Sequence, residues 1–103
     1  MKKITKIAVI YSGTRKTDNA LLRVNEIIES SNSEVILSTN IKKLNSETIK
    51  QASKAELILV LGGDGTMIGS IRNLHSLNVP FLGINSGTVG FLTDLSLSKI
   101  EKL

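Results

Sequence analysis

Residues 57–66, which read LILVLGGDGT, decide the fold. The first five, Leu57–Leu61, form an uninterrupted apolar run, as expected for a strand that is buried on both faces of a parallel sheet. After the glycines, apolar residues recur with helical spacing from Met67 to Leu77. The stretch therefore predicts a buried strand, a glycine turn and the start of a helix.

The glycines of this junction favour a bound anion. Gly62, Gly63 and Gly65 let a ligand approach the backbone closely because no Cβ atom stands in the way. The N–H groups of the helix's first turn then favour a negative charge. Two common phosphate motifs do not fit, because no Lys follows as in a Walker A loop and Gly69 comes one residue too late for the dinucleotide pattern. The sequence predicts a phosphate-binding loop of another type.

The carboxylate of Asp64 is unexpected inside such a loop. Two like unit charges about 4 Å apart repel by about 1 kcal/mol in water and by about 4 kcal/mol at an effective dielectric constant of 20. Asp64 therefore weakens phosphate binding unless a metal ion or a substrate hydroxyl intervenes. In phosphoryl transfer, an Asp can accept or orient the proton of the attacking hydroxyl. Helix capping is the structural alternative for Asp64, although Thr66 is equally able to cap.

Strands and helices alternate along the rest of the chain. Strands are expected at Lys6–Tyr11, Glu34–Ser38 and Val79–Ile84. Helices are expected from the capping residue Asp18 to about Ser31 and from the capping residue Ser46 through Ser53. This order predicts βαβ units and hence an α/β fold, a Rossmann-like parallel sheet flanked by helices. Such sheets bind their ligands at the carboxyl ends of the strands.

A second glycine-containing loop, residues 85–90, follows the last predicted strand and reads NSGTVG. The amide of Asn85 can bond a ribose hydroxyl or an adenine edge, with a turn-forming Asn as the alternative. Gly87 permits either a close approach of a ligand or a plain turn. Phe91, just after the loop, either packs in the core or stacks on a purine ring. The two loops face one crevice if their strands are neighbours in the sheet.

Composition excludes several classes of partner. A length of 103 residues fits one domain, and no apolar run approaches the roughly 20 residues of a membrane span. The chain has no cysteine, so disulfides and thiolate metal sites are excluded, and a cytoplasmic protein is expected. The net charge of +4 comes from basic residues scattered along the chain, with few aromatic residues between them. We therefore expect no nucleic-acid partner and no membrane partner.

Together, the two loops resemble those of the NAD kinases. The motif Gly62–Thr66 is shared with diacylglycerol and sphingosine-type lipid kinases and, in similar form, with phosphofructokinases. Residues 83–94, which read GINSGTVGFLTD, separate these families. Lipid kinases carry a Pro-Leu-Gly-Thr-x-Asn pattern there, whereas the Gly-Phe-Leu-Thr-Asp ending is specific to NAD kinases. The similarity extends over the chain from Lys6 onward.

This resemblance implies the N-terminal domain of the NAD kinase/diacylglycerol kinase-like fold. It also implies that ATP, or in some members inorganic polyphosphate, phosphorylates the 2′-hydroxyl of the adenosine ribose of NAD to give NADP, with a divalent metal, Mg²⁺, as cofactor. Transferred residue by residue, the resemblance assigns catalysis to Asp64, NAD binding to Asp64, Gly65, Asn85, Gly87 and Phe91, and phosphate binding to Gly62, Gly63, Gly65 and Thr66.

The resemblance further implies a second, β-rich domain that supplies an Asn-Glu pair, further NAD contacts and an oligomer interface. Residues 1–95 are therefore expected to form the α/β N-terminal domain, and residues 96–103 to begin the connection to the second domain. A homo-oligomer is expected for the full-length protein, and little activity for this piece alone. One departure is Gly69, where many bacterial members carry His or Arg. A non-catalytic nucleotide-binding module and a lipid kinase of the diacylglycerol kinase type are the alternatives.

Overall fold

Four parallel strands form one sheet in the order β2-β1-β3-β4, as the alternation of strands and helices predicts. The computed structural model describes residues 4–84, apart from the side chains of residues 15–18. Along the chain the elements are β1 (Lys6–Tyr11), α1 (Arg15–Ser30), β2 (Glu34–Asn40), the 3-10 helix η1 (Ile41–Lys43), α2 (Ser46–Ala52), β3 (Leu57–Leu61), α3 (Asp64–Leu74), the 3-10 helix η2 (His75–Leu77) and β4 (Phe81–Ile84).

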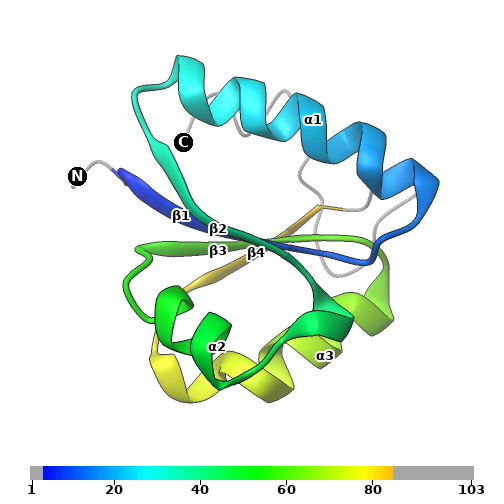
Figure 1. Cartoon of the computed structure of the whole chain (residues 1–103), viewed down its shortest axis with the longest axis vertical. Coiled ribbons are helices and arrows are strands. Elements are labelled where there is room, and N and C mark those ends of the chain that lie inside the picture. Colours follow the sequence, from blue (N-terminus) through cyan, green and yellow to red (C-terminus); the bar gives the residue numbers. More distant parts are fainter. Residues whose placement is uncertain (1–3, 85–103) are drawn as a thin grey trace.

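The sheet separates two helical layers (Figure 1). Helix α1 covers one face, and helices α2 and α3 cover the other. Strand β3 lies between β1 and β4, and each of its five residues is buried. Its side chains alternate between the two faces, so Leu57, Leu59 and Leu61 pack on the α1 side while Ile58 and Val60 pack on the other. The continuous apolar run therefore reflects burial on both faces.

Two element starts differ from the sequence prediction. Helix α1 begins at Arg15, three residues before the expected cap Asp18. The reason lies in Gly13, whose φ of +81° lets the chain turn directly from β1 into the helix. Helix α2 is capped by Asn45 and not by Ser46: Asn45 Oδ1 accepts from Thr48 N at 2.9 Å, and Asn45 N donates to Thr48 Oγ1 at 2.8 Å.

Other boundaries shift by a few residues. Strand β2 continues past Ser38 to Asn40, because its last residues pair with the end of β1. The helix after the glycine loop is α-helical only from Asp64 to Leu74 and ends in the 3-10 turn η2. Strand β4 begins at Phe81 and not at Val79, although the Pro80 carbonyl still accepts from Ile58 N at 2.9 Å. Within residues 4–84, no helix is long and apolar enough to cross a membrane.

Candidate phosphate-binding site

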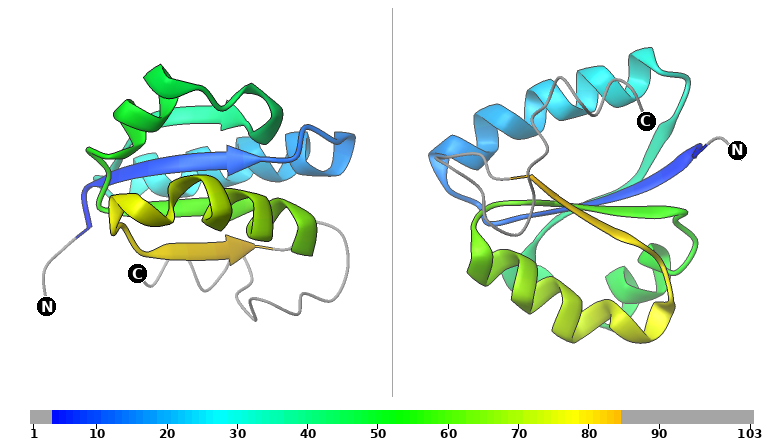
Figure 2. Two further views of the ribbon diagram at one scale, coloured as in Figure 1. Left: turned by 90° about the horizontal axis from the view of Figure 1, so that it is seen from below. Right: turned by 180° about the vertical axis from the view of Figure 1, so that it is seen from behind.

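The carboxyl ends of β1, β3 and β4 meet at one edge of the sheet. Tyr11 pairs with Leu61, and Leu61 pairs with Ile84. The pairing continues one residue further, since Ser12 N donates to the Leu61 carbonyl and Gly62 N to the Ile84 carbonyl, each at 3.1 Å. All four strands point toward this edge (Figure 2, left). The last residues of these three strands therefore lie side by side.

The edge holds the topological switch point of the sheet. From β1 the chain crosses to β2 on one side, whereas from β3 it crosses to β4 on the other. In open α/β sheets the crevice outside such a point is the usual ligand site. Here it lies between the segment 12–14 after β1 and the segment 62–65 after β3. The glycine loop thus occupies the position where this fold binds ligands.

Neither Asp64 nor Thr66 caps helix α3, so the capping alternative for Asp64 is wrong. Gly63 is the N-cap residue and makes no side-chain capping bond. The first α-helical hydrogen bond runs from Met67 N to the Gly63 carbonyl at 3.2 Å. The N–H groups of the residues before Met67 have no acceptor inside the helix, as at any helix N-terminus. The helix therefore presents uncapped N–H groups at the switch point.

The glycines of the loop have different roles in the fold. Gly62 has a φ of +152°, and a Cβ atom there would lie 2.6 Å from Thr66 Oγ1, so the backbone itself requires glycine. At Gly63 and Gly65 a Cβ atom would meet no atom of the described residues within 4 Å. Both residues are exposed, so packing of the described residues does not explain them. Open space above a glycine backbone is what close approach of a ligand requires.

Asp64 and Thr66 lie on opposite sides of this helix start. Asp64 is the first α-helical residue and is exposed, flanked by the two exposed glycines. Thr66 is half-buried, and its hydroxyl lies against Gly62. The exposed chemical groups at the helix start are therefore a carboxylate and backbone amides. Asn85, Gly87 and Phe91 lie outside the described residues.

The departure at Gly69 has a local packing reason. A Cβ atom at Gly69 would lie 3.1 Å from Ile41 Cδ1, closer than ordinary van der Waals contact. Ile41 belongs to η1, which packs against α3. Position 69 of this chain therefore faces a neighbouring turn of the protein, and a larger side chain there must displace Ile41.

Sequence reasoning missed the role of Asn40 in the turn after β2. Asn40 ends β2 opposite Tyr11, and its Oδ1 accepts from Lys42 N at 2.9 Å, which closes the turn η1. A Cβ atom at Gly13 would collide with Asn40 Nδ2, so this glycine admits the Asn40 amide beside the β1 loop. The available signal was Gly13 itself, because a glycine after a first strand marks a close approach of two backbones or side chains.

A metal site made by the protein alone is absent from residues 4–84, where no group of three or more His, Cys, Asp or Glu side chains converges. One exposed carboxylate, Asp64, stands at the switch point. Mg²⁺ often binds through one or two carboxylates plus the phosphates of a substrate. The residues present therefore fit a metal that arrives with a phosphorylated ligand.

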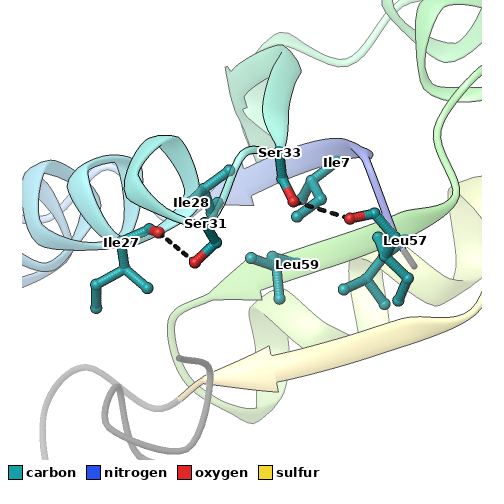
Figure 3. A pocket seen from close by; sticks show the side chains of 8 residues that line it. Ile7, Ile27, Ile28, Ser31, Ser33, Leu57 and Leu59 are labelled. Carbon is teal, nitrogen blue, oxygen red and sulfur yellow. Dashed lines mark hydrogen bonds between the residues drawn. The ribbon is translucent and has the colours of Figure 1, made fainter. Parts of the chain in front are cut away.

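A small apolar pocket lies at the opposite edge of the sheet, on the α1 side (Figure 3). Its polar atoms are already bonded: Ser31 Oγ donates to the Ile27 carbonyl and Ser33 Oγ to the Ile4 carbonyl, each at 2.8 Å. The pocket is lined by Ile4, Ile7, Ile27, Ile28, Ser31, Ser33, Leu57 and Leu59. It offers no free polar group and is separate from the glycine loop.

The fold and its switch-point loop define a Rossmann-like domain with a glycine-rich loop that carries a carboxylate at a helix N-terminus. Comparison with known proteins identifies the family within this class. The family model described as ATP-NAD kinase N-terminal domain matches residues 5–103, and the chain belongs to this family.

Relatives agree with this assignment. The chain is similar to an NAD kinase of Colwellia psychrerythraea, with 41% identity over 88% of this chain and 31% of the relative. It is similar to an NAD kinase of Clostridium beijerinckii, with 36% identity over 95% of this chain and 34% of the relative. Over 48% of this chain and 17% of the relative, it is 54% identical to an NAD kinase of Nitrosospira multiformis. The chain thus spans about a third of the length of the Colwellia and Clostridium relatives.

Proposed function

We propose that this chain forms the N-terminal part of an NAD kinase, which transfers the terminal phosphoryl group of ATP or polyphosphate to the 2′-hydroxyl of the adenosine ribose of NAD. In this proposal residues 1–95 form the α/β domain, and residues 96–103 begin the connection to a second domain. The NAD kinases of Colwellia psychrerythraea and Clostridium beijerinckii support the activity.

One observation carries the proposal: Asp64 is exposed at an uncapped helix N-terminus, between two glycines that the described packing does not require. A helix N-terminus alone attracts phosphate, and a carboxylate there opposes it. The carboxylate becomes useful when the second substrate is a hydroxyl, because it can hold the hydroxyl proton while phosphate binds to the amides. A phosphotransferase that acts on an alcohol needs this combination.

In the proposed reaction, Asp64 accepts or orients the proton of the ribose 2′-hydroxyl. The hydroxyl oxygen forms a bond to the terminal phosphorus of the donor, while the bond from that phosphorus to the bridging oxygen breaks and ADP, or the shortened polyphosphate, leaves. Backbone N–H groups at Gly63 and Gly65 bind donor phosphate oxygens. The half-buried hydroxyl of Thr66, which lies against Gly62, is assigned to phosphate binding on the resemblance alone. The backbone of Gly65 also lies against NAD, because no side chain separates them.

Gly62 supports this binding by shaping the turn that its φ of +152° allows. Asn85, Gly87 and Phe91 complete the NAD site in the proposal, on the family resemblance alone. Asp64 and the donor phosphates would hold Mg²⁺, whose charge would offset the repulsion between the phosphates and this carboxylate.

The test is Asp64→Asn in the full-length protein. This variant keeps the size of the side chain but removes the proton acceptor, so we expect NADP formation to fall by about a hundredfold or more. The measurement is a coupled assay of NADP at saturating NAD and ATP, with circular dichroism to check the fold. The fold should persist because Asp64 is exposed and caps nothing.

Three other outcomes would each contradict a part of the proposed function. Near-normal turnover of Asp64→Asn would exclude the catalytic role of Asp64. Binding of NAD and ATP without any NADP from the wild type would point to a non-catalytic nucleotide-binding module. Phosphorylation of diacylglycerol in place of NAD would point to a lipid kinase.

The proposal also covers the setting of the enzyme. A cytoplasmic location is consistent with a sequence without cysteine. Homo-oligomer formation by the full-length protein rests on the resemblance alone, and light scattering after size-exclusion chromatography measures it directly.

A further inference from the structure

We propose that Lys42 and Lys43 of the turn η1 bind the phosphate chain of the phosphoryl donor. This inference rests on the proposed function, in that it names residues for the donor side of the same site. Neither lysine belongs to the glycine loop, and both are exposed. The ligand chemistry is a chain of at least three phosphates, whether from a nucleoside triphosphate or from inorganic polyphosphate.

The turn η1 and the glycine loop lie at the same edge of the sheet. Asn40, the residue before η1, pairs with Tyr11, and Tyr11 pairs with Leu61, the residue before the glycine loop. Adjacent strands lie about 4.8 Å apart, so two strand spacings place the backbones of Asn40 and Leu61 about 10 Å apart. The turn with both lysines and the glycine loop therefore leave the same edge of the sheet, on either side of the β1 loop.

The turn is held in place by three neighbouring elements. Asn40 Oδ1 accepts from Lys42 N at 2.9 Å, and the Asn40 amide fits beside Gly13 only because glycine stands there. Ile41 packs with the apolar core on the α2 and α3 side and contacts Gly69 of α3. The backbones of both lysines are thus fixed relative to the helix that starts at the glycine loop.

Their charges are available for a ligand. Among the side chains that the structure describes, no carboxylate forms an ion pair with Lys42 or Lys43. The Debye length is about 8 Å at physiological ionic strength, so the lysine charges act on a bound polyanion where their flexible stems bring them closer than the roughly 10 Å between the two backbones. The donor carries several negative charges, and their attractions to the two lysines add up. A Lys ammonium on its flexible stem can also reach the phosphate oxygens. An ordinary solvated lysine pair is the alternative that the experiment must exclude.

A matched pair of lysines serves as control. Lys50 lies in the last turn of α2, and Lys54 follows that helix shortly before β3 begins. Lys54 is therefore near the amino edge of the sheet, roughly 16 Å away along the five-residue strand β3, or about two Debye lengths. The double variants K42A/K43A and K50A/K54A remove the same charge from the two edges.

The experiment measures tripolyphosphate binding to the full-length protein by calorimetry at low and at physiological salt, and KM for ATP in the NADP assay. We expect K42A/K43A to weaken tripolyphosphate binding and to raise KM for ATP by about three- to tenfold, with kcat little changed and a smaller salt dependence than the wild type. K50A/K54A should match the wild type, and the charge-preserving K42R/K43R should keep most of the affinity.

Equal losses of tripolyphosphate affinity in K42A/K43A and K50A/K54A would mean that only the overall charge matters, and would overturn the inference. Unchanged tripolyphosphate affinity in K42A/K43A would overturn it too. A raised KM for ATP with unchanged tripolyphosphate binding in K42A/K43A would also overturn the inference, because the lysines would then contact the nucleoside and not the phosphates. If the wild type binds tripolyphosphate through these lysines but makes no NADP, the proposed function fails while the phosphate site stands.

Discussion

At the scale of single residues, the glycine loop combines two kinds of glycine that look alike in the sequence. Gly62 is required by its backbone conformation and by Thr66, which lies where a side chain would go. Within the part of the chain that the structure describes, a side chain at Gly63 or Gly65 would meet no such contact. The sequence predicts a tight turn with ligand access, and the structure assigns the turn to the first glycine and the access to the other two.

Gly65→Ala and Gly62→Ala separate these roles. Alanine at position 65 should raise the free energy of unfolding by about 0.5–1 kcal/mol, since glycine disfavours helix, while lowering NADP formation by about tenfold or more because the methyl group enters the ligand space. Alanine at position 62 should destabilise the fold by about 1–3 kcal/mol, because the backbone conformation is strained for alanine and its methyl group meets Thr66. Urea unfolding and the NADP assay measure both effects.

Each variant has an outcome that would contradict the role assigned to its glycine. A Gly65→Ala protein that is both stable and fully active would show that no ligand uses the space over this glycine. A Gly62→Ala protein as stable as the wild type would contradict the strained turn.

At the scale of elements, neighbours decided where helices and strands begin and end. Asp18 is a good capping residue in the sequence, yet α1 starts earlier because Gly13 turns the chain at once. Strand β2 gains Thr39 and Asn40 because β1 offers them partners. Apolar periodicity predicted that these elements exist, whereas their ends depend on contacts between residues distant in the chain.

One such contact ties the starts of two strands together. Glu56 Oε1 accepts from Thr5 N at 2.9 Å, from Thr5 Oγ1 at 2.8 Å and from Lys6 N at 3.1 Å. Glu56→Ala should therefore lower the free energy of unfolding by about 1–2 kcal/mol, because charge-assisted bonds are lost at the start of β1.

Amide hydrogen exchange at Thr5 and Lys6 should quicken in the same variant, since both N–H groups lose their acceptor. Glu56→Gln keeps an acceptor oxygen and should lose less stability. Exchange rates in Glu56→Ala equal to those of the wild type would mean that these bonds do not hold the strand. The NADP activity should change little, because this contact lies at the amino edge of the sheet.

At the scale of the whole molecule, one central strand joins two apolar cores. Leu59 is fully buried in β3 and packs on the α1 side, while its neighbours in sequence pack on the other side. Leu22 of α1, although equally apolar, is 66% exposed. The same residue type therefore contributes very differently to stability in the two places.

The matched substitutions Leu59→Ala and Leu22→Ala measure this difference. Removing the buried side chain should lower the free energy of unfolding by about 2–5 kcal/mol, because a cavity remains in the core. Removing the exposed one should change it by about 0.5 kcal/mol or less. Similar values for the two variants, measured by chemical denaturation, would contradict the assignment of β3 as the central strand of the core.

The sequence by itself determined the class of fold, the buried strand at residues 57–61 and the glycine loop with its carboxylate. These are local properties, since apolar period, glycine freedom and charge are all read from neighbours in the chain. Only the tertiary structure decided that β3 lies between β1 and β4, and that Gly62 is the one glycine of the loop that the described packing requires. It also decided that the turn η1, with its two lysines, lies at the same edge of the sheet as the glycine loop. Strand order joins residues that are far apart in the sequence, and the pairing and packing that bring them together have no local signal.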